Sequence, residues 1–272
     1  MSVYLSSNLI ADEILKYMKM ADAAYNKTES EIEGKYSDSY RVKVVEATET
    51  DGQCILLFDD TNKAQYIVTR GSYTIENWVE DAKYAKTLDE KTGIYIHSGF
   101  LESAIEVYDL ILSDLDTSYT TYLTGHSLGG AITVILHLYL LKDGFTIGQS
   151  ITFGQPMITN YDGVCEYRDI PLLRVVNNKD LVPLLPPLTV ISSKNGRYRH
   201  FGEETILLED TYYCNLDETS AEAITVSDFE ANLAAGETSI ADHFVDKYIV
   251  NIQTKLTEAT EVDYDDRESY LD

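Results

Sequence analysis

The pentapeptide GHSLG at positions 125–129 constrains this chain more than any other feature of its sequence. It follows a β-branched and aromatic run at Tyr119–Thr124 and precedes a helical pattern that extends to about Leu141, where Gly144 supplies a C-cap signal. A serine at a sharp strand-to-helix turn projects its hydroxyl out of the sheet, and small neighbours let the backbone crowd together. The amides of the helix N-terminus point to where negative charge would develop. The pattern therefore predicts a nucleophilic Ser127, and its plain alternative is a glycine-rich turn without chemistry.

Strand-like and helical segments alternate around this unit. Strands are expected at Cys54–Phe58, Gln65–Thr69, Ser150–Phe153, Leu172–Asn177 and within Tyr198–Leu208, and helices over 8–24, from Gly99 to about Leu112 and over Ile240–Ile252. The first two strands predict a hairpin, and the later alternation is typical of a parallel sheet with covering helices, so the predicted fold class is α/β. We expect 1–256 to form a single domain and the acidic residues 257–272 a flexible tail. Residues 210–236 give no clear pattern.

Charge and apolar runs exclude several classes of protein. Lys and Arg number 21 against 46 Asp and Glu, a net charge of −25, so nucleic acid is not an expected partner. The most apolar run, Ile132–Leu141, is about half of the roughly 20 residues that a membrane span needs, so no transmembrane segment is expected. The N-terminal sequence lacks the basic head and apolar stretch of a secretory signal. That favours a cytoplasmic protein by default, or a secreted one if the chain is a processed mature form.

The cysteines favour neither a disulfide framework nor a metal site. Cys54, Cys165 and Cys214 are too few and too scattered for such a framework, and none belongs to a CxxC pair. We therefore expect no metal and no organic cofactor.

A serine hydroxyl is a weak nucleophile, so a base must remove its proton and an acid must hold that base in the right tautomer. In a sheet of this topology the chain order is serine, acid, histidine, which leaves His200 and His243 among the five histidines. Asp180 follows the strand Leu172–Asn177 on a loop and is the candidate acid, its alternative being a solvated turn aspartate. From the residues alone, both histidines remain candidates.

Five blocks together resemble the class 3 lipases, the fungal-type triacylglycerol lipases of the α/β-hydrolase fold. The blocks are TRGSYTIENWVEDA at Thr69–Ala82, HSGF at His97–Phe100, TGHSLGGA at Thr124–Ala131, NNKDLVPLLPP at Asn177–Pro187 and ADHF at Ala241–Phe244. The resemblance covers about residues 50–250 and implies that Ser127 is the nucleophile, Asp180 the acid and His243 the base. It assigns His200, in RHFGEE, to a non-catalytic segment. It also implies an α/β-hydrolase with a mostly parallel central sheet, flanking helices and a short helical lid.

The same resemblance implies an oxyanion hole formed by the backbone amide of Leu128 and by Ser72, through its amide and its hydroxyl. Leu128 directly follows the nucleophile, and Ser72 follows a strand and an Arg-Gly pair, where glycine permits a turn toward the reaction centre. Without the family, Ser72 is a candidate helix N-cap.

The segment at about 73–88 carries an amphipathic pattern. Four apolar residues share one face at helical spacing: Ile75, Trp78, Val79 and Ala82. On pattern alone this is a surface helix that packs on the core. The resemblance implies instead a lid that covers the cleft in water and turns its apolar stripe, with Trp78 as anchor, to a lipid–water interface.

These features predict a serine carboxylester hydrolase, and the resemblance implies a lipase that cleaves acylglycerol esters through a Ser127 acyl-enzyme. A phospholipase, a galactolipase and a small-ester esterase with the same triad are alternatives. A catalytically silent lipase-like module that binds lipid or protein is the alternative from another class. The expected partners are an ester lipid and a transient lipid–water interface, neutral or zwitterionic rather than anionic because the chain is so acidic.

Overall fold

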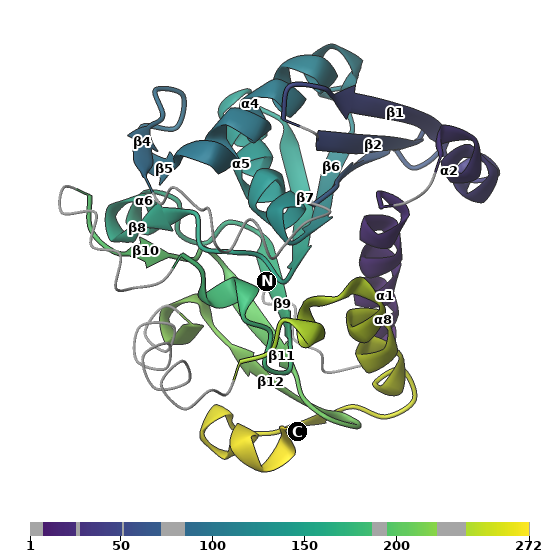
Figure 1. The fold of residues 1–272 in the computed structure, drawn as a ribbon. Helices are drawn as coiled ribbons and strands as arrows, with labels where there is room; N and C mark the ends of the chain where they lie inside the picture. Colours follow the sequence, from purple (N-terminus) through teal and green to yellow (C-terminus); the bar gives the residue numbers. More distant parts are fainter. Residues whose placement is uncertain are drawn as a thin grey trace.

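The computed structural model describes residues 8–25, 28–50, 52–71, 85–186, 195–221 and 238–271. Within these ranges a nine-stranded sheet forms the centre of the molecule (Figure 1). In spatial order its strands are β1 (Arg41–Ala47), β2 (Gly52–Asp59), β3 (Ala64–Thr69), β6 (Thr120–His126), β7 (Thr146–Phe153), β9 (Leu172–Asn177), β11 (Glu203–Leu207), β12 (Tyr212–Leu216) and β13 (Thr260–Glu261). Strands β3, β6, β7, β9 and β11 run parallel, whereas β1–β2, β2–β3 and β11–β12 pair antiparallel. The predicted fold class, a mostly parallel sheet with flanking helices, is confirmed.

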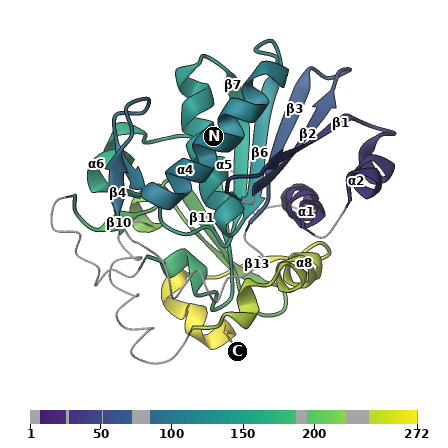
Figure 2. The same ribbon diagram turned by 45° about the horizontal axis from the view of Figure 1, so that its top comes forward.

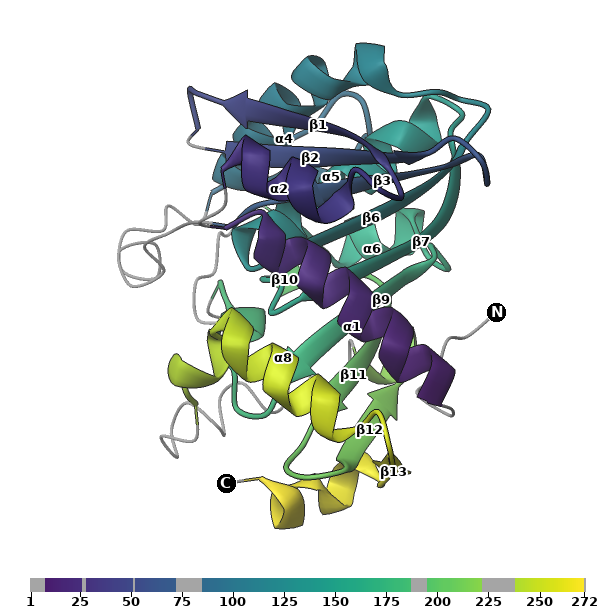
Figure 3. The same cartoon turned by 90° about the vertical axis from the view of Figure 1, so that its right-hand side faces the viewer.

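Helices cover both faces of this sheet. On one face α1 (Asn8–Ala23) packs beside α8 (Val245–Thr254) (Figure 3). On the opposite face lie α4 (Ser98–Ile111) and α5 (Leu128–Lys142) (Figure 2). One apolar cluster fills the space between α4, α5 and the sheet, and another fills the space between α1, α8 and the sheet. Because the central strands are covered on both faces, β9 is buried along its whole length.

A smaller antiparallel sheet lies beside α6 (Tyr161–Glu166) (Figure 1). It consists of β10 (Tyr198–Arg199), β8 (Thr159–Asn160), β5 (Tyr95–His97) and β4 (Lys86–Leu88), in that order. The single strand-like segment expected at Tyr198–Leu208 is therefore two strands in different sheets, because the chain turns at Gly202 (φ 74°). The last three residues of the expected lid, 86–88, form β4 rather than a helix.

Two elements near the N-terminus were not predicted from the sequence. The helix α2 (Glu29–Tyr36) begins with a capping box between Thr28 and Glu31, and it is too short to show apolar periodicity. Strand β1 lies at the sheet edge and only its last residue is buried, so it lacks the apolar run that marks the inner strands.

The C-terminal segment corrects one expectation. The predicted helix at Ile240–Ile252 is broken into a 3₁₀ turn, η3 (Ala241–His243), and α8, because Phe244 is extended (ψ 141°). Within the acidic tail, over 257–271, β13 pairs with β12, and the 3₁₀ segment η4 (Tyr264–Tyr270) follows it; the flexibility of the tail stays a prediction. The tail contacts β12 through Tyr270, whose ring centroid lies 4.3 Å from that of Tyr212.

Candidate active site

Ser127 occupies the turn between β6 and α5 with φ 60° and ψ −130°, a conformation that costs energy for a residue with a side chain. Neighbouring backbone enforces it. The Ser127 amide donates to the Phe153 carbonyl at the end of β7 (2.9 Å). A side chain on Gly125 would overlap the Gly129 carbonyl, and one on Gly129 would overlap the Thr69 carbonyl. The glycines of the pentapeptide are thus required by the close approach of β3, β6 and α5, as the strand–turn–helix interpretation predicts.

His243 and Asp180 form a buried pair. Nδ1 of His243 lies 2.8 Å from Oδ2 and 2.9 Å from Oδ1 of Asp180, and both side chains are 0% exposed. Asp180 follows β9, and His243 ends η3; the two loops are tied by a hydrogen bond from the Ser239 amide to the Lys179 carbonyl (2.7 Å). Because a carboxylate accepts, Nδ1 carries a proton, and in the neutral form of the ring Nε2 then has the lone pair. Nε2 makes no hydrogen bond with the described residues.

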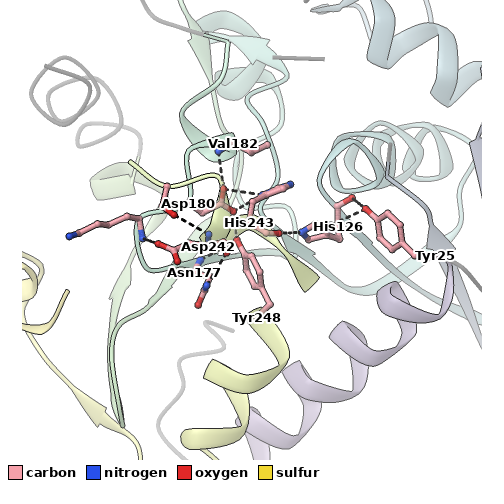
Figure 4. A network of polar contacts seen from close by, with 10 residues as sticks. Tyr25, His126, Asn177, Asp180, Val182, Asp242, His243 and Tyr248 are labelled. Atoms are coloured by element: carbon pink, nitrogen blue, oxygen red, sulfur yellow. Dashed lines mark hydrogen bonds and ion pairs between the residues drawn. The ribbon is translucent and has the colours of Figure 1, made fainter. Parts of the chain in front are cut away.

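Two further donors hold the Asp180 carboxylate (Figure 4). The Tyr248 hydroxyl donates to Oδ2 (2.6 Å), and the Val182 amide donates to Oδ1 (2.9 Å). Burial, together with the charge of Asp180, raises the pKa of Tyr248 well above its usual value, so the phenol keeps its proton and remains a donor. Asp180 is therefore fixed in place by contacts that do not involve His243, and it in turn fixes the imidazole.

Gly154 packs against this pair directly after β7. A Cβ atom at Gly154 (φ 54°) would lie 2.7 Å from Nδ1 of His243 and 2.8 Å from Oδ2 of Asp180, so no larger residue fits. Ser127 bonds to Phe153, the residue just before Gly154. The three predicted residues follow β6, follow β9 and end η3, at the carboxyl edge of the parallel strands, where open α/β sheets bind ligands.

His200, the other candidate base, lies elsewhere. Its Nε2 is 2.7 Å from the Pro183 carbonyl, and burial lowers its pKa well below 6.5. It braces the loop that follows Asp180, whereas His243 is the histidine paired with the carboxylate. Of the two histidines left open by the residues alone, this pairing favours His243, which stays a prediction as the base.

The structure describes only some of the residues predicted to form the oxyanion hole and the lid. Leu128 is the first residue of α5, where backbone amides have no partner within the helix. Gly71, the last described residue before Ser72, lies next to the His126 carbonyl and the Ser127 Cβ. Ser72 itself and the lid residues lie outside the described residues and stay predictions: Ile75, Trp78, Val79 and Ala82.

Four residues around the pair were missed by sequence reasoning: Tyr25, His126, Gly154 and Tyr248. His126 belongs to the GHSLG motif, and its position there was the available signal. Its Nε2 lies 2.8 Å from the His243 carbonyl, and its Nδ1 lies 2.9 Å from the Tyr25 hydroxyl. Tyr25 and Tyr248 gave no signal, because their partners are about 100 and 70 positions away in sequence.

The described ranges contain no disulfide and no cluster of metal-ligating side chains. No group of three or more His, Cys, Asp and Glu side chains there is arranged to hold a metal ion. Cys54, Cys165 and Cys214 are unpaired thiols, and burial raises the pKa of Cys54 and of Cys214 to about 12. None of the helices in this part of the chain combines the length and apolarity that crossing a bilayer requires.

Comparisons with known proteins converge on one family. The sequence model of the family described as "Lipase (class 3)" matches residues 66–190. A lipase of Rhizomucor miehei is 32% identical over 214 residues, which are 71% of this chain and 54% of that protein. A secreted mono- and diacylglycerol lipase of Fusarium solani is 32% identical over 169 residues, 59% of this chain and 49% of that protein. The chain thus spans about half the length of these curated relatives.

Solved structures agree with the sequence relatives. The triacylglyceride lipase of Rhizomucor miehei superimposes with a TM-score of 0.69 at 27% identity, covering 92% of this chain and 98% of that one. A lipase of Rhizopus microsporus var. chinensis gives a TM-score of 0.69 at 26% identity, covering 88% and 87%. With the GHSLG elbow, the buried His–Asp pair and the mostly parallel sheet, these likenesses establish that the chain belongs to the class 3 lipase family and has the α/β-hydrolase fold.

Proposed function

We propose that this chain is a serine carboxylester hydrolase, a lipase that cleaves acylglycerol esters through a Ser127 acyl-enzyme. One observation carries the proposal: a fully buried His243–Asp180 pair, with Nε2 of His243 unbonded among the described residues, lies at the sheet edge where the strained Ser127 turn is found. The family membership supports the same reaction, since the relatives are named lipases.

The proposed reaction uses each residue in one role. Nε2 of His243 removes the proton from Ser127 as its oxygen attacks the acyl carbonyl, and it then protonates the leaving alcohol. Water, activated by the same nitrogen, attacks the acyl-enzyme and releases the fatty acid. Asp180 orients the imidazole and stabilises its cation. The negative oxygen of the tetrahedral intermediate accepts a hydrogen bond from the Leu128 amide and, as a prediction, one from Ser72.

The substrate proposal rests on the relatives and on charge. Mono- and diacylglycerol lipases are among the relatives, which favours neutral glycerides. A net charge of −25 disfavours docking on an anionic lipid surface. A phospholipase A1 activity is the second candidate, because a chloroplastic phospholipase A1 of Arabidopsis thaliana is 27% identical over 140 residues, 46% of this chain and 20% of that protein.

Hydrolysis of p-nitrophenyl esters by the wild type and by Ser127→Ala tests the reaction. Loss of the nucleophile is expected to reduce turnover roughly a millionfold. The matched control is Ser103→Ala, a buried serine on α4 whose hydroxyl bonds to the Gly99 carbonyl and which should keep wild-type activity. Equal rates for the wild type and Ser127→Ala would refute the enzyme and favour a silent lipid-binding module.

A substrate panel then separates the two lipid classes. Emulsified diacylglycerol and triacylglycerol are compared with phosphatidylcholine and with anionic phosphatidylglycerol at several salt concentrations. Faster release of fatty acid from the glycerides supports the lipase. Faster release of fatty acid from phosphatidylcholine would show instead that the chain is a phospholipase.

A further inference from the structure

We propose that His126 and Tyr25 are positioning residues for the base of this hydrolase: Tyr25 fixes the tautomer of His126, and His126 then holds both the backbone and the ring of His243. The inference rests on the proposed function and adds two residues to it. Neither touches the bond that is cleaved. Their effect is exerted through His243.

The contacts form a continuous chain from the end of α1 to the base (Figure 4). The Tyr25 hydroxyl lies 2.9 Å from Nδ1 of His126, and Nε2 of His126 lies 2.8 Å from the backbone carbonyl of His243. The two imidazole rings lie 4.5 Å apart between centroids, inclined by 33°. His126 is 1% exposed, so both ring nitrogens depend on these protein partners. The residue before the nucleophile is thus bonded directly to the residue that carries the base.

The chemistry of the partners fixes where the protons lie. A backbone carbonyl only accepts, so Nε2 of His126 must carry a hydrogen and donate it to His243. Burial, and next the neighbouring His243, lower the pKa of His126 well below 6.5, so the ring is neutral and Nδ1 has a lone pair. The Tyr25 hydroxyl therefore donates to Nδ1. Its distance to the His126 carbonyl, 3.4 Å, is longer, so Nδ1 is the better acceptor.

Tyr25 matters because a neutral imidazole has two tautomers. Without the Tyr25 donor, only the His243 carbonyl favours a proton on Nε2. The other tautomer, with its proton on Nδ1, then becomes more populated, and it turns the Nε2 lone pair toward the lone pairs of the His243 carbonyl. That repulsion would displace η3, on which His243 sits, relative to the Ser127 turn. A misplacement of about 1 Å at a reacting group costs on the order of a hundredfold in rate. The hydrogen bond from Tyr25 therefore protects the distance between the base and the nucleophile.

The test uses Tyr25→Phe, His126→Gln, His126→Leu and the double variant Tyr25→Phe/His126→Leu. Tyr17→Phe is the matched tyrosine control, a buried residue on α1 that packs against Tyr66. His137→Leu is the matched histidine control, a buried residue on α5 whose Nδ1 lies 2.8 Å from the Ser150 hydroxyl. All are assayed for kcat and KM on a soluble short-chain p-nitrophenyl ester, so that lipid binding does not enter.

We expect kcat to fall about tenfold in Tyr25→Phe, the scale of one lost hydrogen bond, and about a hundredfold in His126→Leu. KM should stay within about twofold, because the substrate contacts are unchanged. His126→Gln, which supplies an N–H near the position of Nε2, should recover part of the loss. In the His126→Leu background, Tyr25→Phe should add almost nothing, since Tyr25 acts through His126. The two control variants should keep kcat.

Tautomer-sensitive ¹⁵N spectra of the histidines supply a readout that a purely structural role would not move. The wild type should show His126 neutral with its proton on Nε2, and Tyr25→Phe should show both tautomers. A proton on Nδ1 of His126 in the wild type, or a kcat of Tyr25→Phe equal to that of Tyr17→Phe, would overturn the inference. The proposed function would still stand if the wild type is active and Ser127→Ala is inactive. Equal rates for wild type and Ser127→Ala would instead remove the function and the inference together. If His126→Leu does not fold, Tyr25→Phe and the spectra still decide.

Discussion

Tyr248 donates a 2.6 Å hydrogen bond to Oδ2 of Asp180, the oxygen that also lies 2.8 Å from Nδ1 of His243. The same phenol oxygen accepts a bond from the Asn177 amide (3.1 Å), the last residue of β9. One buried hydroxyl thus links the end of a core strand to the carboxylate of the candidate active site. The chemistry of the site is therefore tied to the packing of α8 on the sheet.

Removing that hydroxyl should reduce both stability and rate. Tyr248→Phe leaves the buried Asn177 amide without its acceptor and Asp180 without a donor, at about 1–3 kcal/mol for an unsatisfied buried group. We expect the free energy of unfolding, measured by urea denaturation, to fall by about 2 kcal/mol and kcat to fall several-fold. Tyr17→Phe is the control, and it should change the free energy of unfolding and kcat less than Tyr248→Phe does. Unchanged stability would mean that the bonds contribute nothing net.

Gly154→Ala should inactivate the site by overlap. The added Cβ would lie 2.7 Å from Nδ1 of His243 and 2.8 Å from Oδ2 of Asp180, so the pair must separate or the loop must move. We expect kcat to fall at least a hundredfold, because the base loses its orientation. Gly144→Ala is a matched control, because Gly144 also has a positive φ (83°) but faces open space. This variant should lose stability and keep its activity. Similar activity losses in the two variants would contradict the steric argument.

The sequence predicted those parts of the site that follow from local pattern. The turn that holds Ser127 was predictable because its glycines and flanking apolar runs are contiguous. Strands β2, β3, β6, β7 and β9 were predictable because each contains a short run of β-branched, aromatic or other apolar residues. The break at Phe244, which places His243, was not, because the helical pattern runs across it and no glycine or proline marks it. The tail 257–271 carries many acidic residues, and its packing on β12 depends on tyrosines whose partners are distant in sequence.

The buried histidines should make stability depend on pH. Burial lowers the pKa of His137 on α5 to about 4, below its ordinary 6.5. Between these values the unfolded chain binds a proton that the folded chain does not, so stability is full above about pH 6.5 and is lost as the pH falls toward 4. His137→Gln should therefore reduce the slope of unfolding free energy against pH in this window by up to about 1.4 kcal/mol per pH unit. Parallel curves for wild type and variant would disprove the assignment.

The Arg174–Glu204 pair should be far more costly to break than a surface pair. These residues face each other on β9 and β11, with 3.0 Å between a terminal guanidinium nitrogen of Arg174 and Oε1 of Glu204. Their side chains are 1% and 10% exposed, and Nε of Arg174 also donates to the Phe201 carbonyl (3.0 Å). Arg174→Met leaves a nearly buried carboxylate without its partner, so we expect unfolding free energy to fall by about 3–5 kcal/mol. Lys43→Met, which breaks the more exposed Lys43–Asp114 pair, should cost about 1 kcal/mol or less. In the double variant Arg174→Met/Glu204→Met the orphaned charge is gone, so stability should recover in part. A double variant as unstable as Arg174→Met would show that packing around Arg174, rather than the unpaired charge, sets the loss.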